Sequence, residues 1–80
     1  MFVRVEWMDA YVDYGRKTEE ELKDSKPIAR TSVGHLVFEN DEVVVIAAEV
    51  LVIDSIIYYE NSMMIPKGFV TGPVRQLRMK

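Results

Sequence analysis

A chain of 80 residues is long enough for one small domain and excludes a second, because each domain needs a hydrophobic core of its own. The absence of cysteine excludes disulfides and thiolate metal sites, and 49% hydrophobic residues with a net charge of −3 exclude an intrinsically disordered chain. All thirteen acidic residues lie at or before Glu60, so the C-terminal end is electropositive although the chain as a whole is acidic.

Neither the beginning of the sequence nor its most apolar run predicts a membrane location. Residues 1–7 lack the basic segment, apolar run and small-residue cleavage site of a secretory signal, so we expect a cytoplasmic protein. The apolar run Val43–Tyr59 is shorter than the roughly 20 residues of a membrane-spanning helix, and Glu49 and Asp54 interrupt it. We therefore expect no membrane contact.

The N-terminal third predicts a strand, a connection and a helix. Phe2–Met8 alternates between apolar and charged residues, which is typical of a half-buried strand. Residues 9–15 predict an irregular connection whose aromatic side chains pack back onto the fold. The segment Thr18–Glu21 matches a capping box and predicts a helix of about two turns over Glu19–Asp24, which Pro27 ends. With one large apolar side chain, this helix belongs in a loop.

The next segment predicts a strand that bends. Ile28–Phe38 has apolar residues at both parities, and Gly34 in its middle indicates a bulge or a sharp bend. Glu39–Glu42 contains adjacent asparagine and aspartate between two β-branched runs, which predicts a hairpin turn.

The run Val43–Tyr59 favours strand over helix because valine, isoleucine and tyrosine dominate it. No glycine, proline or asparagine marks a break inside it. We predict one strand from Glu42 or Val43 to about Glu49 or Val50 and a second extended segment over Leu51–Tyr59, with one long bent strand as the alternative.

The C-terminal part predicts three short elements separated by turns. Glu60–Ser62 is the predicted turn that precedes a short strand, Met63–Pro66, which its proline restricts to an edge or a strand end. Lys67–Val70 predicts one helical turn, Thr71–Pro73 a second break, and Val74–Met79 a final strand. Together the elements predict an all-β domain over residues 1–80: a small, closed or partly open barrel of about five or six strands with one short helix in a loop.

No residue pattern predicts catalysis, a cofactor or a metal. His35 is the only histidine, and its neighbours Ser32 and Asp41 lie on a strand and a turn without the spacing of a nucleophilic site. The acidic segment 19–24 is explained by the positive end of a helix dipole. We predict a protein that is not an enzyme, and a small hydrolase-like activity around His35 is the third and weakest hypothesis.

Two adjacent pairs of residues predict a contact surface for another protein. Neighbouring residues on a strand face opposite ways, so one member of Tyr58–Tyr59 and one of Met63–Met64 must point away from the interior. Exposed tyrosine and methionine side chains are typical of protein–protein contacts. We predict a homo-oligomer or a protein partner, with contact residues Ile57, Tyr58, Tyr59, Met63 and Met64.

Nucleic-acid binding is the alternative function. Lys67, Arg75 and Arg78 would contact phosphates, while exposed aromatic side chains would stack on bases. The candidate aromatic residues are Trp7, Tyr11, Tyr14, Tyr58 and Tyr59. The acidity of the chain weighs against this alternative, because affinity for phosphate comes mainly from basic side chains.

Three segments resemble a group of small uncharacterised phage and prophage proteins. They are Val5–Ala10 (VEWMDA), Val33–Val37 (VGHLV) and Ile65–Val70 (IPKGFV), the last followed by Arg75-Gln76-Leu77. The resemblance covers about half of the chain and implies a viral or mobile-element origin, with no known activity. More distantly, a barrel that ends in a one-turn helix and a short strand is similar to SH3-like and Sm-like barrels, and this similarity implies fold alone.

Overall fold

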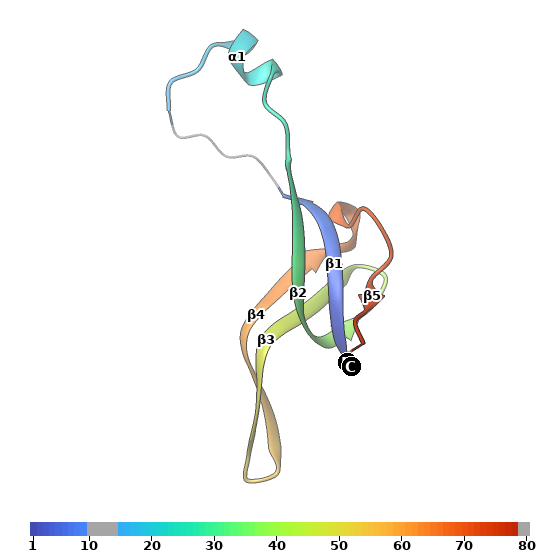
Figure 1. The fold of residues 1–80 in the computed structure, drawn as a ribbon. Coiled ribbons are helices and arrows are strands. Elements are labelled where there is room, and N and C mark those ends of the chain that lie inside the picture. The colour runs from blue at the N-terminus through green and yellow to red at the C-terminus, as the bar shows by residue number, and fades with distance from the viewer. Residues whose placement is uncertain (10–14, 79–80) are drawn as a thin grey trace.

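The computed structural model describes residues 1–9 and 15–78, most of which lie in strands. The strands form one five-stranded antiparallel sheet in the order β4-β3-β2-β1-β5, with β4 and β5 at its two edges (Figure 1). The predicted all-β class with one short helix in a loop is confirmed. In chain order the elements are β1 (Phe2–Asp9), α1 (Glu19–Lys23), β2 (Ile28–Glu39), β3 (Val43–Ile53), β4 (Ile56–Pro66), the 3-10 helix η1 (Lys67–Phe69) and β5 (Arg75–Gln76).

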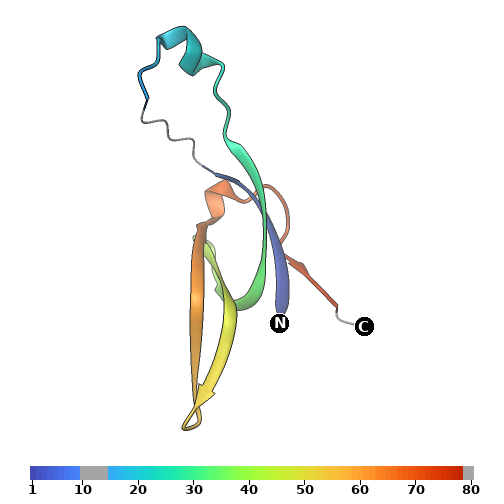
Figure 2. The same ribbon diagram turned by 60° about the vertical axis from the view of Figure 1, so that its left-hand side comes forward.

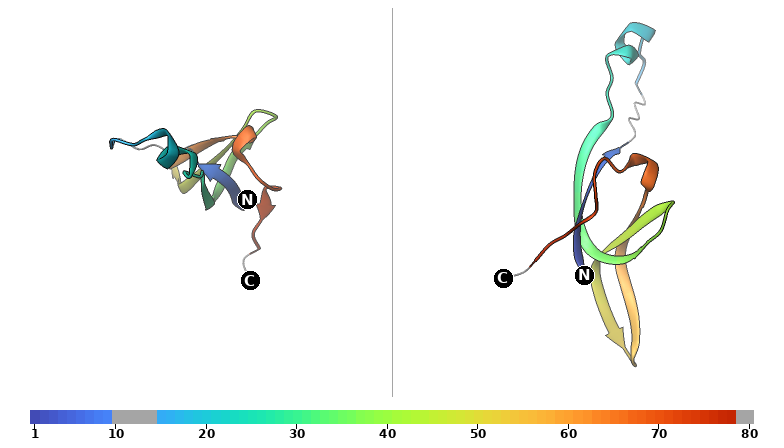
Figure 3. Two further views of the ribbon diagram at one scale, coloured as in Figure 1. Left: turned by 90° about the horizontal axis from the view of Figure 1, so that it is seen from above. Right: turned by 90° about the vertical axis from the view of Figure 1, so that its right-hand side faces the viewer.

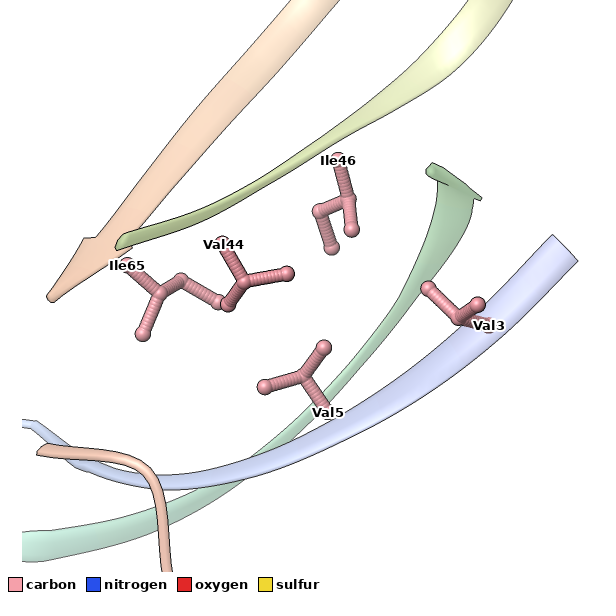
Figure 4. Packing of buried hydrophobic residues seen from close by; sticks show 5 residues of the cluster. All are labelled: Val3, Val5, Val44, Ile46 and Ile65. Carbon is pink, nitrogen blue, oxygen red and sulfur yellow. The ribbon is translucent and has the colours of Figure 1, made fainter. Parts of the chain in front are cut away.

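The hydrophobic core lies between two halves of the same sheet. β2 curves so that β3 and β4 face β1 across the concave side (Figure 2). Val3 and Val5, which the alternation of β1 places on one face, are 1% and 0% exposed. They face three buried residues of the other half (Figure 4). These are Val44, Ile46 and Ile65, and the partly buried Trp7, Leu36, Val70 and Val74 pack around the cluster.

Of the two features predicted at Gly34, a bulge or a sharp bend, the bulge lies elsewhere in β2. The β2–β3 register shifts between Leu36 and Phe38, and pairing of β2 with β1 is regular through Gly34. Glycine is required there because a Cβ atom would lie 2.9 Å from the carbonyl oxygen of Ala47. The residue therefore permits close approach of two strands rather than an extra residue in one of them.

The turn between β2 and β3 is built as predicted. The side-chain oxygen of Asn40 accepts hydrogen bonds from the backbone N–H groups of Glu42 and Val43 at 2.8 and 2.9 Å. This side chain replaces a backbone acceptor and fixes the direction in which β3 leaves the turn.

The apolar run after this turn forms two strands, as predicted, but the break predicted near residue 50 and the alternative of one long bent strand were wrong. β3 continues to Ile53 without a break near residue 50, and Asp54 and Ser55 reverse the chain with φ angles of 51° and 67°. Two successive residues in the left-handed region are typical of a type I′ hairpin turn. Aspartate tolerates this region because its short polar side chain can hydrogen-bond locally. Because this turn contains no glycine, asparagine or proline, the sequence pattern did not predict it.

The predicted turn at Glu60–Ser62 and the separate strand at Met63–Pro66 were also wrong, because both segments belong to β4. Asn61 nevertheless has a φ angle of 54°. The β3–β4 ladder pairs every position from Val43 with Pro66 to Ile53 with Ile56, except Ala48 with Asn61. Asn61 is therefore a kink inside a continuous strand.

The helix and the C-terminal elements follow the prediction closely. The backbone N–H of Glu21 donates to the Thr18 hydroxyl at 3.2 Å, which caps α1. The single helical turn is η1, and Pro66 ends β4 at the edge of the sheet. The final strand is shorter than Val74–Met79: β5 contains two residues, and Met79 lies outside the described part. The predicted packing of Tyr11 and Tyr14 also lies outside the described residues.

Two projections extend from a small body in opposite directions (Figures 1 and 3). One carries α1, and the other is the far half of the β3–β4 hairpin. The molecule measures 55 × 26 × 25 Å and has a radius of gyration of 16.3 Å, compared with about 12 Å for a compact chain of this length. A large part of the surface therefore belongs to the projections.

Candidate interaction surface

The far half of the hairpin, residues 49–60, is called the outer hairpin here. It begins beyond the kink at Asn61 and ends at the two-residue turn. Apart from Glu49, the turn and Glu60, all of its side chains are apolar or aromatic. Leu51 is half-buried and the others are 41–69% exposed: Val50, Val52, Ile53, Ile56, Ile57, Tyr58 and Tyr59.

The register places these side chains on both faces of the hairpin. Directly opposed residues share a face, and successive residues along a strand alternate between faces. One face carries the pairs Val50–Tyr59 and Val52–Ile57, and the other carries Leu51–Tyr58 and Ile53–Ile56. An antiparallel sheet of a soluble protein commonly has one apolar face and one solvated face. The outer hairpin has two apolar faces and no core between them.

A pair of like charges lies at the base of the outer hairpin. Glu49 and Glu60 are directly opposed across β3 and β4. Within the described part of the chain, neither carboxylate forms an ion pair. Like charges in opposed positions destabilise a strand pair. The outer hairpin therefore combines apolar exposure with an unfavourable cross-strand pair.

All five residues predicted to contact a partner lie on β4, and all are exposed. Met63 and Tyr59 share the face that carries the core residue Ile65, whereas Tyr58 and Met64 lie on the opposite face. The prediction that each adjacent pair divides between the two faces is confirmed. Met64 is 62% exposed, so the apolar surface continues past the kink towards the body.

A pocket of about 440 Å³ lies beside Met63, and the sequence did not indicate it. Two interacting pairs line it: the indole Nε1 of Trp7 donates to the hydroxyl of Ser32 at 3.0 Å, and Arg30 pairs with Asp9 at 2.6 Å. These residues meet because β1 and β2 pair Trp7 with Arg30. The sequence did not indicate the pocket because its residues come together through the β1–β2 register, which the sequence does not specify.

The three basic residues of the alternative function lie on different elements. Lys67, in η1, forms an ion pair with Glu39, so part of its charge is neutralised. Arg75 of β5 is opposite Arg4 of β1, and Arg78 follows β5. His35, the only histidine, packs edge to face against Phe2 with 5.1 Å between ring centroids.

Two further features concern metals and membranes. No three histidine, aspartate or glutamate side chains of the described residues are grouped so that they could bind a metal ion. In the same part of the chain, no helix has both the length and the apolar character needed to cross a membrane.

Comparisons of the chain with protein-family models, with curated proteins and with solved structures gave no match.

Proposed function

We propose that this chain is a non-enzymatic protein–protein interaction module that associates with copies of itself through the outer hairpin and β4. The observation that supports the proposal is the exposure of apolar side chains on both faces of the outer hairpin. A two-stranded ribbon without a covering layer is marginally stable in water, so an apolar ribbon of this kind gains stability by contact with another chain.

The proposal includes an SH3-like or Sm-like barrel as the architecture. Three features support it: the strand order β4-β3-β2-β1-β5, the single turn η1 between the last two strands, and an isolated bridge between Trp7 and Val70. The bridge brings the segment after η1 against the end of β1. The phage or prophage origin rests on the three sequence segments given above and adds no activity.

Size-exclusion chromatography with light scattering, over a range of protein concentrations, tests self-association. The wild type is expected to have a mass of at least twice 9.3 kDa. Ile53→Thr with Ile57→Thr keeps β-branched residues in the ribbon but removes apolar surface, so it is expected to shift the mass towards the monomer. Val33→Thr is the matched control, because Val33 is 47% exposed on β2, away from the hairpin.

A strictly monomeric wild type at every concentration would rule out self-association. A control variant that dissociates as much as the hairpin variant would show that the outer hairpin is not the contact. The nucleic-acid alternative is tested separately with single-stranded RNA and DNA, where phosphate contacts predict binding that weakens steeply as salt is raised.

A further inference from the structure

The two edges of the sheet differ in how they are protected. Natural edge strands are kept from pairing with other chains by short length, by lysine or proline, or by bulges. β5 is two residues long, contains Arg75 and follows Pro73. β4 is eleven residues long, has no basic residue, and contains proline only at its last position. The described structure thus leaves one long edge that is interrupted by Glu60 and the kink at Asn61, and this edge carries the predicted contact residues.

The chain as a whole exposes more surface than a compact monomer of its mass. The accessible surface is 6543 Å², whereas a compact monomer of 9.3 kDa has about 5,000 Å². The excess of about 1,500 Å² is larger than the roughly 800 Å² that each partner buries in an interface of standard size. The outer hairpin supplies much of the exposed apolar part of this area.

We propose that two copies pair their β4 strands antiparallel about a twofold axis at Asn61, which joins the two sheets into one. This inference rests on the proposed self-association and adds its geometry. A twofold contact between two β4 strands suits the edge better than a repeated head-to-tail contact. In a head-to-tail contact β4 would pair with β5 of the next copy, which offers two residues, whereas β4 with β4 offers eleven. A twofold contact of identical surfaces also closes the assembly at a dimer.

The kink selects the register. Placing both positive-φ residues at the same level confines the irregular backbone of the two strands to one point of the pairing. In an antiparallel pair this requires Asn61 to face Asn61 of the second copy, and the same register pairs all residues of β4 from Ile56 to Pro66. A shift that centred the axis on Glu60 would oppose two carboxylates, which is unfavourable. In the proposed register Glu60 is opposite Ser62 of the second copy.

The side chains brought together in this register are complementary. Tyr58 is opposite Met64 of the second copy, and Tyr59 is opposite Met63, so each tyrosine ring meets a thioether, a favourable contact. Ile57 is opposite Ile65, which is fully buried in the core. The apolar face of each outer hairpin therefore prolongs the core face of the other copy.

Single cysteines test the register, because the chain contains no cysteine. Asn61→Cys is expected to form a disulfide dimer on mild oxidation, since facing residues in an antiparallel pair have Cα atoms about 5 Å apart, within the range of a disulfide. Because Asn61 has a positive φ angle, a second experiment avoids it: a mixture of Glu60→Cys and Ser62→Cys is expected to form the mixed dimer faster than either variant alone.

Ser55→Cys at the hairpin turn is the matched control. In the proposed register the two copies of this residue are roughly 40 Å apart, from about 3.3 Å per residue over twelve positions, so no cross-link is expected. Cross-linking of Ser55→Cys without cross-linking on β4 would overturn the register in favour of contact between hairpin tips. A wild type that is dimeric by light scattering but whose β4 cysteines do not cross-link would overturn this inference and leave the proposed function intact. A monomeric wild type would remove both. Circular dichroism of each variant shows whether it is folded.

Discussion

A close approach between two strands gives a direct test of the fold. Gly34 of β2 lies against β3, and a Cβ atom there would be 2.9 Å from the carbonyl oxygen of Ala47 and 3.3 Å from Cβ of Ile46. The first distance is shorter than ordinary van der Waals contact, and its partner is backbone that cannot rotate away. Gly34→Ala therefore requires β2 and β3 to separate.

The expected cost follows from this geometry. Forcing one extra methyl group into a packed site costs about 1–3 kcal/mol. Because no glycine among the described residues has a positive φ angle, alanine is conformationally allowed and recovers roughly 0.4–1 kcal/mol through the unfolded state. The net loss of unfolding free energy is about 0–2.6 kcal/mol, or about 1.3 kcal/mol from the middle of both ranges, and each kcal/mol lowers the Tm of a domain of this size by about 4–8 °C.

Chemical and thermal denaturation, followed by circular dichroism at one fixed protein concentration, measures this loss. The concentration is held constant because self-association changes apparent stability. Gly68→Ala and Gly72→Ala are matched controls, since a Cβ atom at either position meets no atom within 4 Å. We expect both to be neutral or slightly stabilising. If Gly34→Ala is as stable as these two variants, the close approach of β2 and β3 is incorrect.

Three further predictions concern the hairpin and the pocket. Ser55→Gly relieves a positive φ angle and is expected to raise the unfolding free energy by about 1 kcal/mol in urea denaturation; a decrease would contradict the type I′ turn. Added salt is expected to strengthen self-association, measured by light scattering, because it screens Glu49 and Glu60, which the proposed dimer gathers around its axis. Glu60→Gln should tighten association at low salt and reduce that salt dependence, and association that weakens with salt would count against the register. Trp7→Phe keeps an aromatic ring but removes the donor to Ser32 together with part of the ring volume, so the hydrogen bond is measured by a double-mutant cycle with Ser32→Ala, in which a coupling energy of about 1 kcal/mol is expected by the same urea experiment.

Local patterns determined the elements whose structure depends on neighbouring residues. The alternation of β1 placed Val3 and Val5 in the core, Thr18 capped α1, and Pro66 ended an edge strand. Each of these features depends on side-chain periodicity or on a hydrogen bond within a few residues, so the sequence alone was sufficient. The same alternation predicted one exposed member in each of the pairs Tyr58–Tyr59 and Met63–Met64, but it did not predict that both members of each pair are exposed.

The tertiary structure decided the features that depend on partners far away in the chain. Asp54 and Ser55 carry no strong turn signal, and their position was set by the pairing of β3 with β4 over the whole hairpin. Gly34 was required by the backbone of another strand, and Trp7 meets Ser32 only through the β1–β2 register. The length of the hairpin beyond the body also depends on this pairing. Register is a property of two strands together, so it decided which apolar side chains were left without cover.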